Sequence, residues 1–283
     1  YSLAASPVDA RNNWWGDASG PQHPTLNPLG LGNAVSDNVL FVPWLTSDPT
    51  TEKTIDPVLI IPGILGSAEK DGVWLIDPIF HTYDDLIATL AANGYVEGQN
   101  LFSFPYDWRF SNVLTAVALK DKIAEVKNIC QCAKVDLAAH SMGGLVARQY
   151  IQSPQYANDV DQLIFLGTPH LGAPQAYLPW EGAEMPPGFV NQSIRTLLWW
   201  EAKKLDLSLF DYIHQSVLSI RELLPIYDYL TLKDSSVVEK YPNGYPTNPF
   251  LENLFAGTNG FLNSGVAITN VVGDVGNDST ITS

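Results

Sequence analysis

Ser141 is the side chain whose surroundings most clearly predict chemistry. A largely apolar run over residues 135–139 leads into it, and small residues stand two positions before and two positions after it, at Ala139 and Gly143. A helical pattern begins at once. This is the layout of a nucleophile elbow, usually written G-x-S-x-G, with Ala139 in the first glycine position.

The elbow needs small neighbours for a physical reason. A strand that turns sharply into a helix holds the serine in a strained conformation, where larger neighbours would collide. The turn also points the free N–H groups of the helix start toward whatever the serine attacks. Because so short a pattern also arises by chance, a serine in an ordinary strand–helix turn is the alternative.

The chain around Ser141 alternates between strands and helices from residue 57 onward. Several strands are apolar throughout, which is typical of a parallel sheet covered by helices on both faces. The predicted fold class is therefore α/β. Strands are expected over residues 57–62, 101–106, 135–140, 161–167 and 265–274, and helices over 83–92, 112–130 and from the elbow to 151.

Residues from 173 to about 260 interrupt this alternation. They contain Trp180, Trp199 and Trp200, many leucines and proline-rich loops, and helices are expected over 193–204 and 212–224. Loops at the carboxyl ends of a parallel sheet carry function, so we interpret the segment as a helical lid or cap. Extra packing helices with aromatic cores are the alternative.

Residues 1–53 form a separate, irregular and β-rich segment in this interpretation. They are dense in Pro, Gly, Asn and Asp and cannot bury a core of their own. The stretch N-x-W-G-D-x-S-G-P over 13–21, with V-P-W-L at 42–45, resembles the final coil and cap of right-handed parallel β-helix proteins. A glycine-rich linker that carries tryptophans is the alternative. Residues 54–283 form the second domain.

The composition describes a folded, acidic chain. Of 283 residues, 46% are hydrophobic, and 30 acidic against 15 basic residues give a net charge of −15. Such a surface repels nucleic acid and gains nothing from anionic lipid, so any contact with lipid must be apolar. Cys130 and Cys132 are expected to be unpaired apolar fillers, because two residues apart is poor geometry for a disulfide. Neither a metal nor a cofactor is expected.

Four segments in a fixed order resemble a known family. Together they are similar to the α/β-hydrolase fold, and within it to the lecithin:cholesterol acyltransferase-like and lysosomal phospholipase A2-like lipases, over residues 56 to 283. The segments are VLIIPGILGS at 58–67, FPYDWR at 104–109, AAHSMGG at 138–144 and LGTPHLGAP at 166–174.

The resemblance implies a nucleophile and two oxyanion donors. Ser141 would attack the ester after a histidine takes its proton. The backbone N–H of Met142, the residue after the nucleophile, would hold the oxyanion, and by resemblance the backbone N–H of Ile64 would be the second donor. Asp107 and Arg109 are expected to fix a loop that Trp108 anchors, and not to act in catalysis.

The catalytic acid and histidine are harder to place. In this fold both should follow the serine, the acid first. By topology Asp274 is the candidate acid, with Asp278 behind it, whereas the resemblance places the acid further on, in a G-D-G-T-V-type loop that this sequence lacks. The chain is therefore expected to be C-terminally truncated before both groups and to hydrolyse esters weakly by itself. None of the five histidines, His23, His81, His140, His170 and His214, follows the last strand, where the base should be. His170 is expected to be structural and His214 packed or on the surface, and normal turnover by this chain alone would point to one of these two.

The resemblance implies a serine-dependent lipase, phospholipase or acyltransferase that acts on lipid esters through an acyl-enzyme, with a lipid surface contacted through the aromatic lid. A carboxylesterase or lipid-anchor deacylase is one alternative. A non-catalytic surface or adhesion module with a decayed triad is another. The β-helix-like start implies a secreted or cell-surface protein.

Overall fold

The computed structural model describes residues 6–48, 56–185, 189–232 and 235–273 of the chain. The chain divides into two compact units, Tyr1–Ile55 and Asp56–Ser283. Each unit is described by itself below.

The first unit is held together by short parallel strand pairs. Strand β1 (Val8–Asp9) pairs with β4 (Val39–Leu40), and β2 (Pro21–Gln22) pairs with β3 (Gly32–Ala34), both parallel. The indole of Trp44 packs where a Cβ on Gly20 would stand, only 2.2 Å away. Strand β4 ends before Pro43, which has no N–H with which to continue a ladder.

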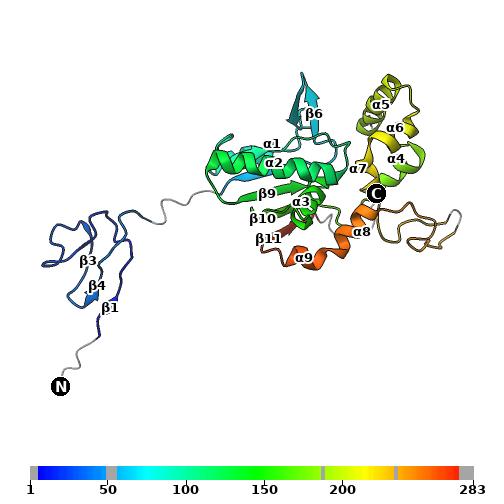
Figure 1. Cartoon of the computed structure of the whole chain (residues 1–283). Coiled ribbons are helices and arrows are strands. Elements are labelled where there is room, and N and C mark those ends of the chain that lie inside the picture. Colours follow the sequence, from blue (N-terminus) through cyan, green and yellow to red (C-terminus); the bar gives the residue numbers. More distant parts are fainter. Residues whose placement is uncertain (1–5, 49–55, 186–188, 233–234, 274–283) are drawn as a thin grey trace. The chain divides into compact units, whose positions relative to one another are not determined.

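A five-stranded parallel sheet forms the centre of the second unit. Its strands are β5 (Val58–Ile61), β8 (Leu101–Ser103), β9 (Val135–His140), β10 (Val160–Leu166) and β11 (Ala267–Val271), in the spatial order β11-β10-β9-β5-β8. Three helices follow successive strands: α1 (Asp84–Ala92), α2 (Asn112–Cys130) and α3 (Met142–Gln152) (Figure 1).

Both faces of the sheet are covered, as its apolar strands predict. Val58 and Ile60 belong to the cluster that includes Tyr83 and the apolar side of α1. Leu59 and Ile61 point the other way, into the large cluster that α2 and α3 complete. Alternate residues of one strand thus face different helices, which requires apolar side chains along its whole length. The expected α/β-hydrolase fold is confirmed.

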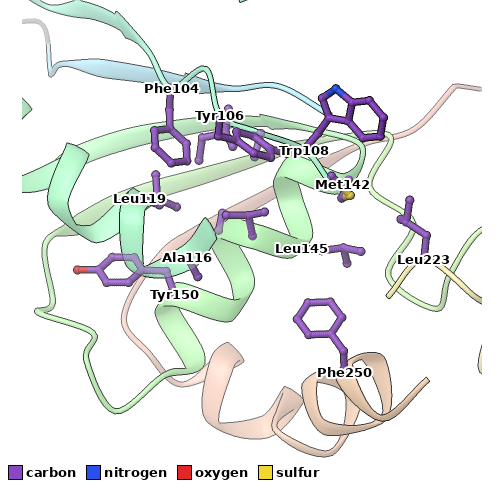
Figure 2. Packing of buried hydrophobic residues seen from close by; sticks show 14 of the residues in the cluster. Phe104, Tyr106, Trp108, Ala116, Leu119, Met142, Leu145, Tyr150, Leu223 and Phe250 are labelled. Carbon is purple, nitrogen blue, oxygen red and sulfur yellow. The ribbon is translucent and has the colours of Figure 1, made fainter. Parts of the chain in front are cut away.

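Helix α3 is the most deeply buried helix near the sheet. All of its residues except Gln149 and Gln152 are buried. Figure 2 shows its side chains Met142, Leu145 and Tyr150 among aromatic residues that follow β8 and residues of α2. A helix enclosed in this way holds its N-terminus firmly in place.

Helix α2 has the predicted bounds, but the cysteines at its end were predicted wrongly. Cys130 and Cys132 are disulfide-bonded, with Cα atoms 5.2 Å apart. Gln131 between them is left-handed, with φ 54°, and ends the helix. The Cα separation lies within the usual range for a disulfide, and the left-handed turn changes the direction of the chain between the two cysteines.

The segment after β10 is helical, but its elements differ from the expected ones. Helix α5 (Phe189–Lys204) begins four residues earlier than predicted. The helix expected over 212–224 is broken at Val217, with φ −123° and ψ 60°, into α6 (Leu209–Ser216) and α7 (Leu218–Arg221). The other elements are η1 (Pro174–Ala176), α4 (Tyr177–Gly182), α8 (Pro249–Ala256) and α9 (Thr258–Leu262). No helix among the described residues is long and apolar enough to cross a membrane.

An antiparallel hairpin that the sequence interpretation missed follows β5. It consists of β6 (Ser67–Lys70) and β7 (Val73–Ile76). Asp71 and Gly72 form its two-residue loop and both have positive φ, 53° and 81°. Asp-Gly is a preferred pair for such a turn, so a local signal for the hairpin is present in the sequence.

Candidate active site

Ser141 lies at the sharp turn between β9 and α3. Its backbone has φ 51° and ψ −123°, a conformation that non-glycine residues rarely adopt. Its N–H donates to the carbonyl of Leu166 on the neighbouring strand, at 3.0 Å. The strained strand–helix turn expected of a nucleophile elbow is therefore present.

The glycines after Ser141 allow other segments to come close. A Cβ on Gly143 would stand 2.5 Å from the carbonyl oxygens of Ile61 and Pro62, and one on Gly144 would stand 2.0 Å from Oγ1 of Thr168. The elbow therefore packs directly against the loop that follows β5 and the turn that follows β10. Larger residues at either glycine would separate these segments.

The loop after β5 reaches Ser141 itself. A Cβ on Gly63 would stand 2.8 Å from the Cβ of Ser141. Two tyrosine hydroxyls hold this loop: that of Tyr106 donates to the carbonyl of Pro62 at 2.8 Å, and that of Tyr83 accepts from the N–H of Gly63 at 2.9 Å. We name residues 62–66 the oxyanion loop, after the role expected of Ile64.

The two expected oxyanion donors are unoccupied. Within the described part of the chain, neither the N–H of Ile64 nor that of Met142 donates a hydrogen bond. The N–H of Met142 is free because a helix leaves its first N–H groups without an internal partner. The N–H groups of Ile64 and Met142 flank Gly63 and Ser141, whose close packing brings the two segments together.

An apolar cavity of about 580 Å³ opens at Ser141. Its walls come from the oxyanion loop, from Trp108 and from the helical segment after β10, which contributes Leu198, Ile220 and Leu223. A second cavity, of about 330 Å³, shares Leu65, Trp108, Ile194 and Leu198 with the first and extends along the β6–β7 hairpin. The helical segment therefore forms part of the site, in the position expected of a lid.

The FPYDWR segment attaches the helical segment to the sheet. The guanidinium of Arg109 makes two hydrogen bonds to the carboxylate of Asp107, at 2.7 and 2.6 Å. The carbonyl of Arg109 accepts from the N–H of Ser219, and the carboxylate of Glu222 accepts from the hydroxyl of Ser111 at 2.5 Å. These contacts fix the helical segment beside the start of α2.

No described histidine is hydrogen-bonded to Ser141, and each has other contacts. His170 stands edge-on to Phe165, 4.6 Å between ring centroids, and burial with the charge of Arg148 lowers its pKa. His214 stacks on Trp180 at 3.9 Å. Nδ1 of His140 is hydrogen-bonded to the Tyr83 hydroxyl, at 2.7 Å. His81 is paired with Asp84, and His23 lies in the first unit.

The acid candidate Asp274, with Asp278, lies outside the described residues. Among the residues that are described, no group of histidine, cysteine and carboxylate side chains could hold a metal ion.

The fold and the site define the class: an α/β-hydrolase with a serine in a strained elbow beneath an apolar cavity. Residues 71–186 match the family model described as "Lecithin:cholesterol acyltransferase". The matched segment contains Ser141, and the match agrees with the resemblance that the four sequence motifs indicate.

Two curated relatives from Arabidopsis thaliana share this region. "Phospholipase A(1) LCAT3" is 34% identical over 122 residues, which are 42% of this chain and 24% of the relative. "Lecithin-cholesterol acyltransferase-like 4" is 30% identical over 144 residues, 46% of this chain and 27% of the relative. The chain therefore spans about a quarter of the length of these relatives.

Solved structures with a related fold include two bacterial enzymes. The mature lipase BlEst2 of Bacillus licheniformis is 16% identical, with a TM-score of 0.49 over 78% of this chain and 67% of that chain. Phospholipase PlaB of Legionella pneumophila is 14% identical, with a TM-score of 0.46 over 77% of this chain and 38% of that chain.

Proposed function

We propose that Ser141 is the nucleophile of a lipase, phospholipase or acyltransferase that cleaves carboxylic esters of lipids. One observation carries the proposal: a serine in a strained elbow lies on the wall of an apolar cavity, within the segment that matches the family. The strained turn presents the hydroxyl to the cavity, and the cavity offers space for an acyl chain.

The reaction proceeds through an acyl-enzyme. The Ser141 oxygen attacks the ester carbonyl while a histidine, which the resemblance places beyond the described residues, takes the hydroxyl proton, and a tetrahedral oxyanion forms. The backbone N–H groups of Ile64 and Met142 donate to that oxyanion. Collapse of the intermediate expels the alcohol of the lipid, which takes the proton from the histidine. Water then releases the fatty acid, or a second alcohol takes the acyl group instead.

The substrate is an ester with a long acyl chain. The cavity wall is mostly apolar and carries no charged side chain, and Gln175 is its polar member besides Ser141. Such a wall stabilises hydrocarbon. The names of the two relatives, a phospholipase A(1) and a lecithin-cholesterol acyltransferase-like protein, support a glycerophospholipid.

A lipid surface is the place from which such a substrate would enter. Trp200 is 59% exposed on helix α5, beside Trp199 and Leu197, on the helix that contributes Leu198 to the cavity. A tryptophan at a membrane surface inserts its ring among the headgroups. Since the chain carries a net charge of −15, zwitterionic or neutral lipid is favoured over anionic lipid.

The test combines covalent labelling with chain-length preference. In the full-length protein a fluorophosphonate should label Ser141, and Ser141→Ala should abolish the labelling. Hydrolysis of p-nitrophenyl esters, and of phosphatidylcholine vesicles, should rise from acetate to long acyl chains. A preference for acetate would identify a carboxylesterase. Labelling that is absent, or that persists in Ser141→Ala, would contradict the proposal and favour the non-catalytic module.

A further inference from the structure

The hydroxyl of Tyr83 connects the two backbone segments that meet at Ser141. Tyr83 stands just before α1, and its ring is buried against the sheet. Its oxygen accepts from the N–H of Gly63 at 2.9 Å and lies 2.7 Å from Nδ1 of His140. Gly63 belongs to the oxyanion loop, and His140 is the last residue of β9, directly before Ser141.

The donors and acceptors in the hydrogen bonds from Gly63 to Tyr83 and from Tyr83 to His140 follow from the number of hydrogen atoms on each group. A tyrosine hydroxyl carries one hydrogen, and the N–H of Gly63 already points at the oxygen. The hydroxyl hydrogen is therefore free to donate to Nδ1 of His140, which must then be an acceptor with its own hydrogen on Nε2. A protonated imidazole would present a second donor to the same oxygen and leave the hydroxyl hydrogen without this partner.

The electrostatic surroundings of His140 favour this neutral form. Burial lowers the pKa of His140, and the charge of Asp77 opposes the shift more weakly. Burial also raises the pKa of Tyr83 to about 12, so the hydroxyl stays a donor at neutral pH. Asp77 and Tyr83 are the titratable groups that interact with His140, and Asp77 is itself occupied by the N–H groups of Phe80 and Thr82.

We propose that Tyr83 and His140 are positioning residues that set the oxyanion loop against Ser141, an inference that rests on the proposed function. Gly63 is in contact with both sides of this arrangement, because its α-carbon faces the Cβ of Ser141 while its N–H is held by Tyr83. The next N–H along the chain is that of Ile64, the proposed oxyanion donor. A shift at Gly63 is therefore a shift of the donor relative to the developing charge.

The loop has a second anchor, which makes the contribution of the first one measurable. The Tyr106 hydroxyl donates to the carbonyl of Pro62, and the Tyr106 side chain is buried. Loss of the Tyr83 hydroxyl leaves that anchor and the aromatic ring in place. Loss of the Tyr83 hydroxyl should therefore displace the N–H of Ile64 without unfolding the oxyanion loop.

The test measures kcat and KM separately for four variants in the full chain, with a long-chain p-nitrophenyl ester. Tyr83→Phe should lower kcat about tenfold with KM nearly unchanged, because an oxyanion donor acts in the transition state and its complete loss costs about 10²–10³. His140→Leu should give a similar loss. His140→Asn should recover most of it, because the asparagine Oδ1 can accept from Tyr83. Tyr95→Phe, the same change in the same apolar cluster, is the matched control.

A second measurement does not depend on turnover. In protein labelled with ¹⁵N-histidine, His140 should show the neutral Nε2–H tautomer at neutral pH, and its Nδ1 signal should shift in Tyr83→Phe, where the hydrogen bond to that nitrogen is lost. A cationic or Nδ1–H imidazole would overturn the inference. So would an unchanged kcat in Tyr83→Phe, or an equal loss in His140→Asn and His140→Leu. If Ser141→Ala is as active as the unmodified protein, the proposed function itself fails, which is a different result.

Discussion

Strand β9 carries an unusual residue near each of its ends, and the two ends differ in what surrounds them. At the carboxyl end, Ser141 is strained, faces a cavity and lies against a loop whose polar groups are held by tyrosine hydroxyls. Near the amino end, Asp136 is a buried carboxylate. Its Oδ1 has no hydrogen-bond partner, and burial raises its pKa to about 6.

The comparison shows that a perturbed pKa does not by itself identify a site. The pKa of Asp136 is raised well above the ordinary value of an aspartate, and a carboxyl with a raised pKa is a familiar sign of catalysis. Yet Asp136 lines neither of the two cavities and is accompanied by Asp56 and Asp161, which only add negative charge. Ser141 combines backbone strain, free N–H donors and space for a substrate, and on this ground we propose the carboxyl end of the sheet as the functional one.

Among the substitutions that test the difference between the two ends of β9, Gly63→Ala should have the largest effect on the rate of hydrolysis. The new Cβ would stand 2.8 Å from the Cβ of Ser141. The oxyanion loop and the elbow are both held by their neighbours, so moving either one destabilises the fold. The oxyanion loop must move, and hydrolysis should fall about 10²-fold, as expected when an oxyanion donor is misplaced.

Gly260→Ala is the matched control, because nothing lies within 4 Å of the added methyl group in helix α9. It should leave the rate and the melting temperature nearly unchanged. Full activity in Gly63→Ala would mean that the loop after β5 does not take part in the reaction.

How far the sequence predicts these features depends on how local their signals are. The elbow is predictable because its small residues and apolar run are adjacent, and α2 is predictable because its apolar residues recur at helical spacing. The break at Val217 has no such marker. The anchors of the oxyanion loop are not predictable either, since Tyr83 and Tyr106 lie 20 and 44 residues from the groups they bind. Periodicity within one element carries no information about contacts of that range.

A smaller effect is expected at the amino end, from Asp136→Asn. The folded-state pKa of about 6 lies above the ordinary value of 3.8, so the folded chain resists ionisation of this carboxyl. The resulting loss of stability is absent below pH 4, grows as pH rises through this interval and is complete above pH 6. Asparagine cannot ionise and still accepts from Gln162, as the carboxylate does at 3.1 Å.

Asp136→Asn should therefore raise the free energy of unfolding by about 1–2 kcal/mol at pH 8 and by nothing near pH 4, since each pKa unit corresponds to about 1.4 kcal/mol and partial solvation reduces the total. Denaturant titrations at the two pH values measure this directly. The rate of ester hydrolysis should not change. A loss of activity with unchanged stability would reverse the comparison and make the amino end functional.

The smallest effect is expected from the disulfide between Cys130 and Cys132, which also lies toward the amino end, where α2 leads into β9. It closes a very short loop, and the stabilisation that a disulfide gives through the unfolded chain grows with loop length. Cys130→Ser with Cys132→Ser should lower the free energy of unfolding by no more than about 1.5 kcal/mol and leave fluorophosphonate labelling of Ser141 intact. The same bond bears on location, because disulfides persist in oxidising compartments, and we propose on this ground that the protein is secreted or held at the cell surface.

The test is mass spectrometry of protein isolated from its source with its free thiols blocked at once. The peptide that contains both cysteines should be lighter by two hydrogen atoms than its reduced form. Two blocked thiols in that peptide would contradict both the disulfide and the proposed location, but not the role proposed for Ser141.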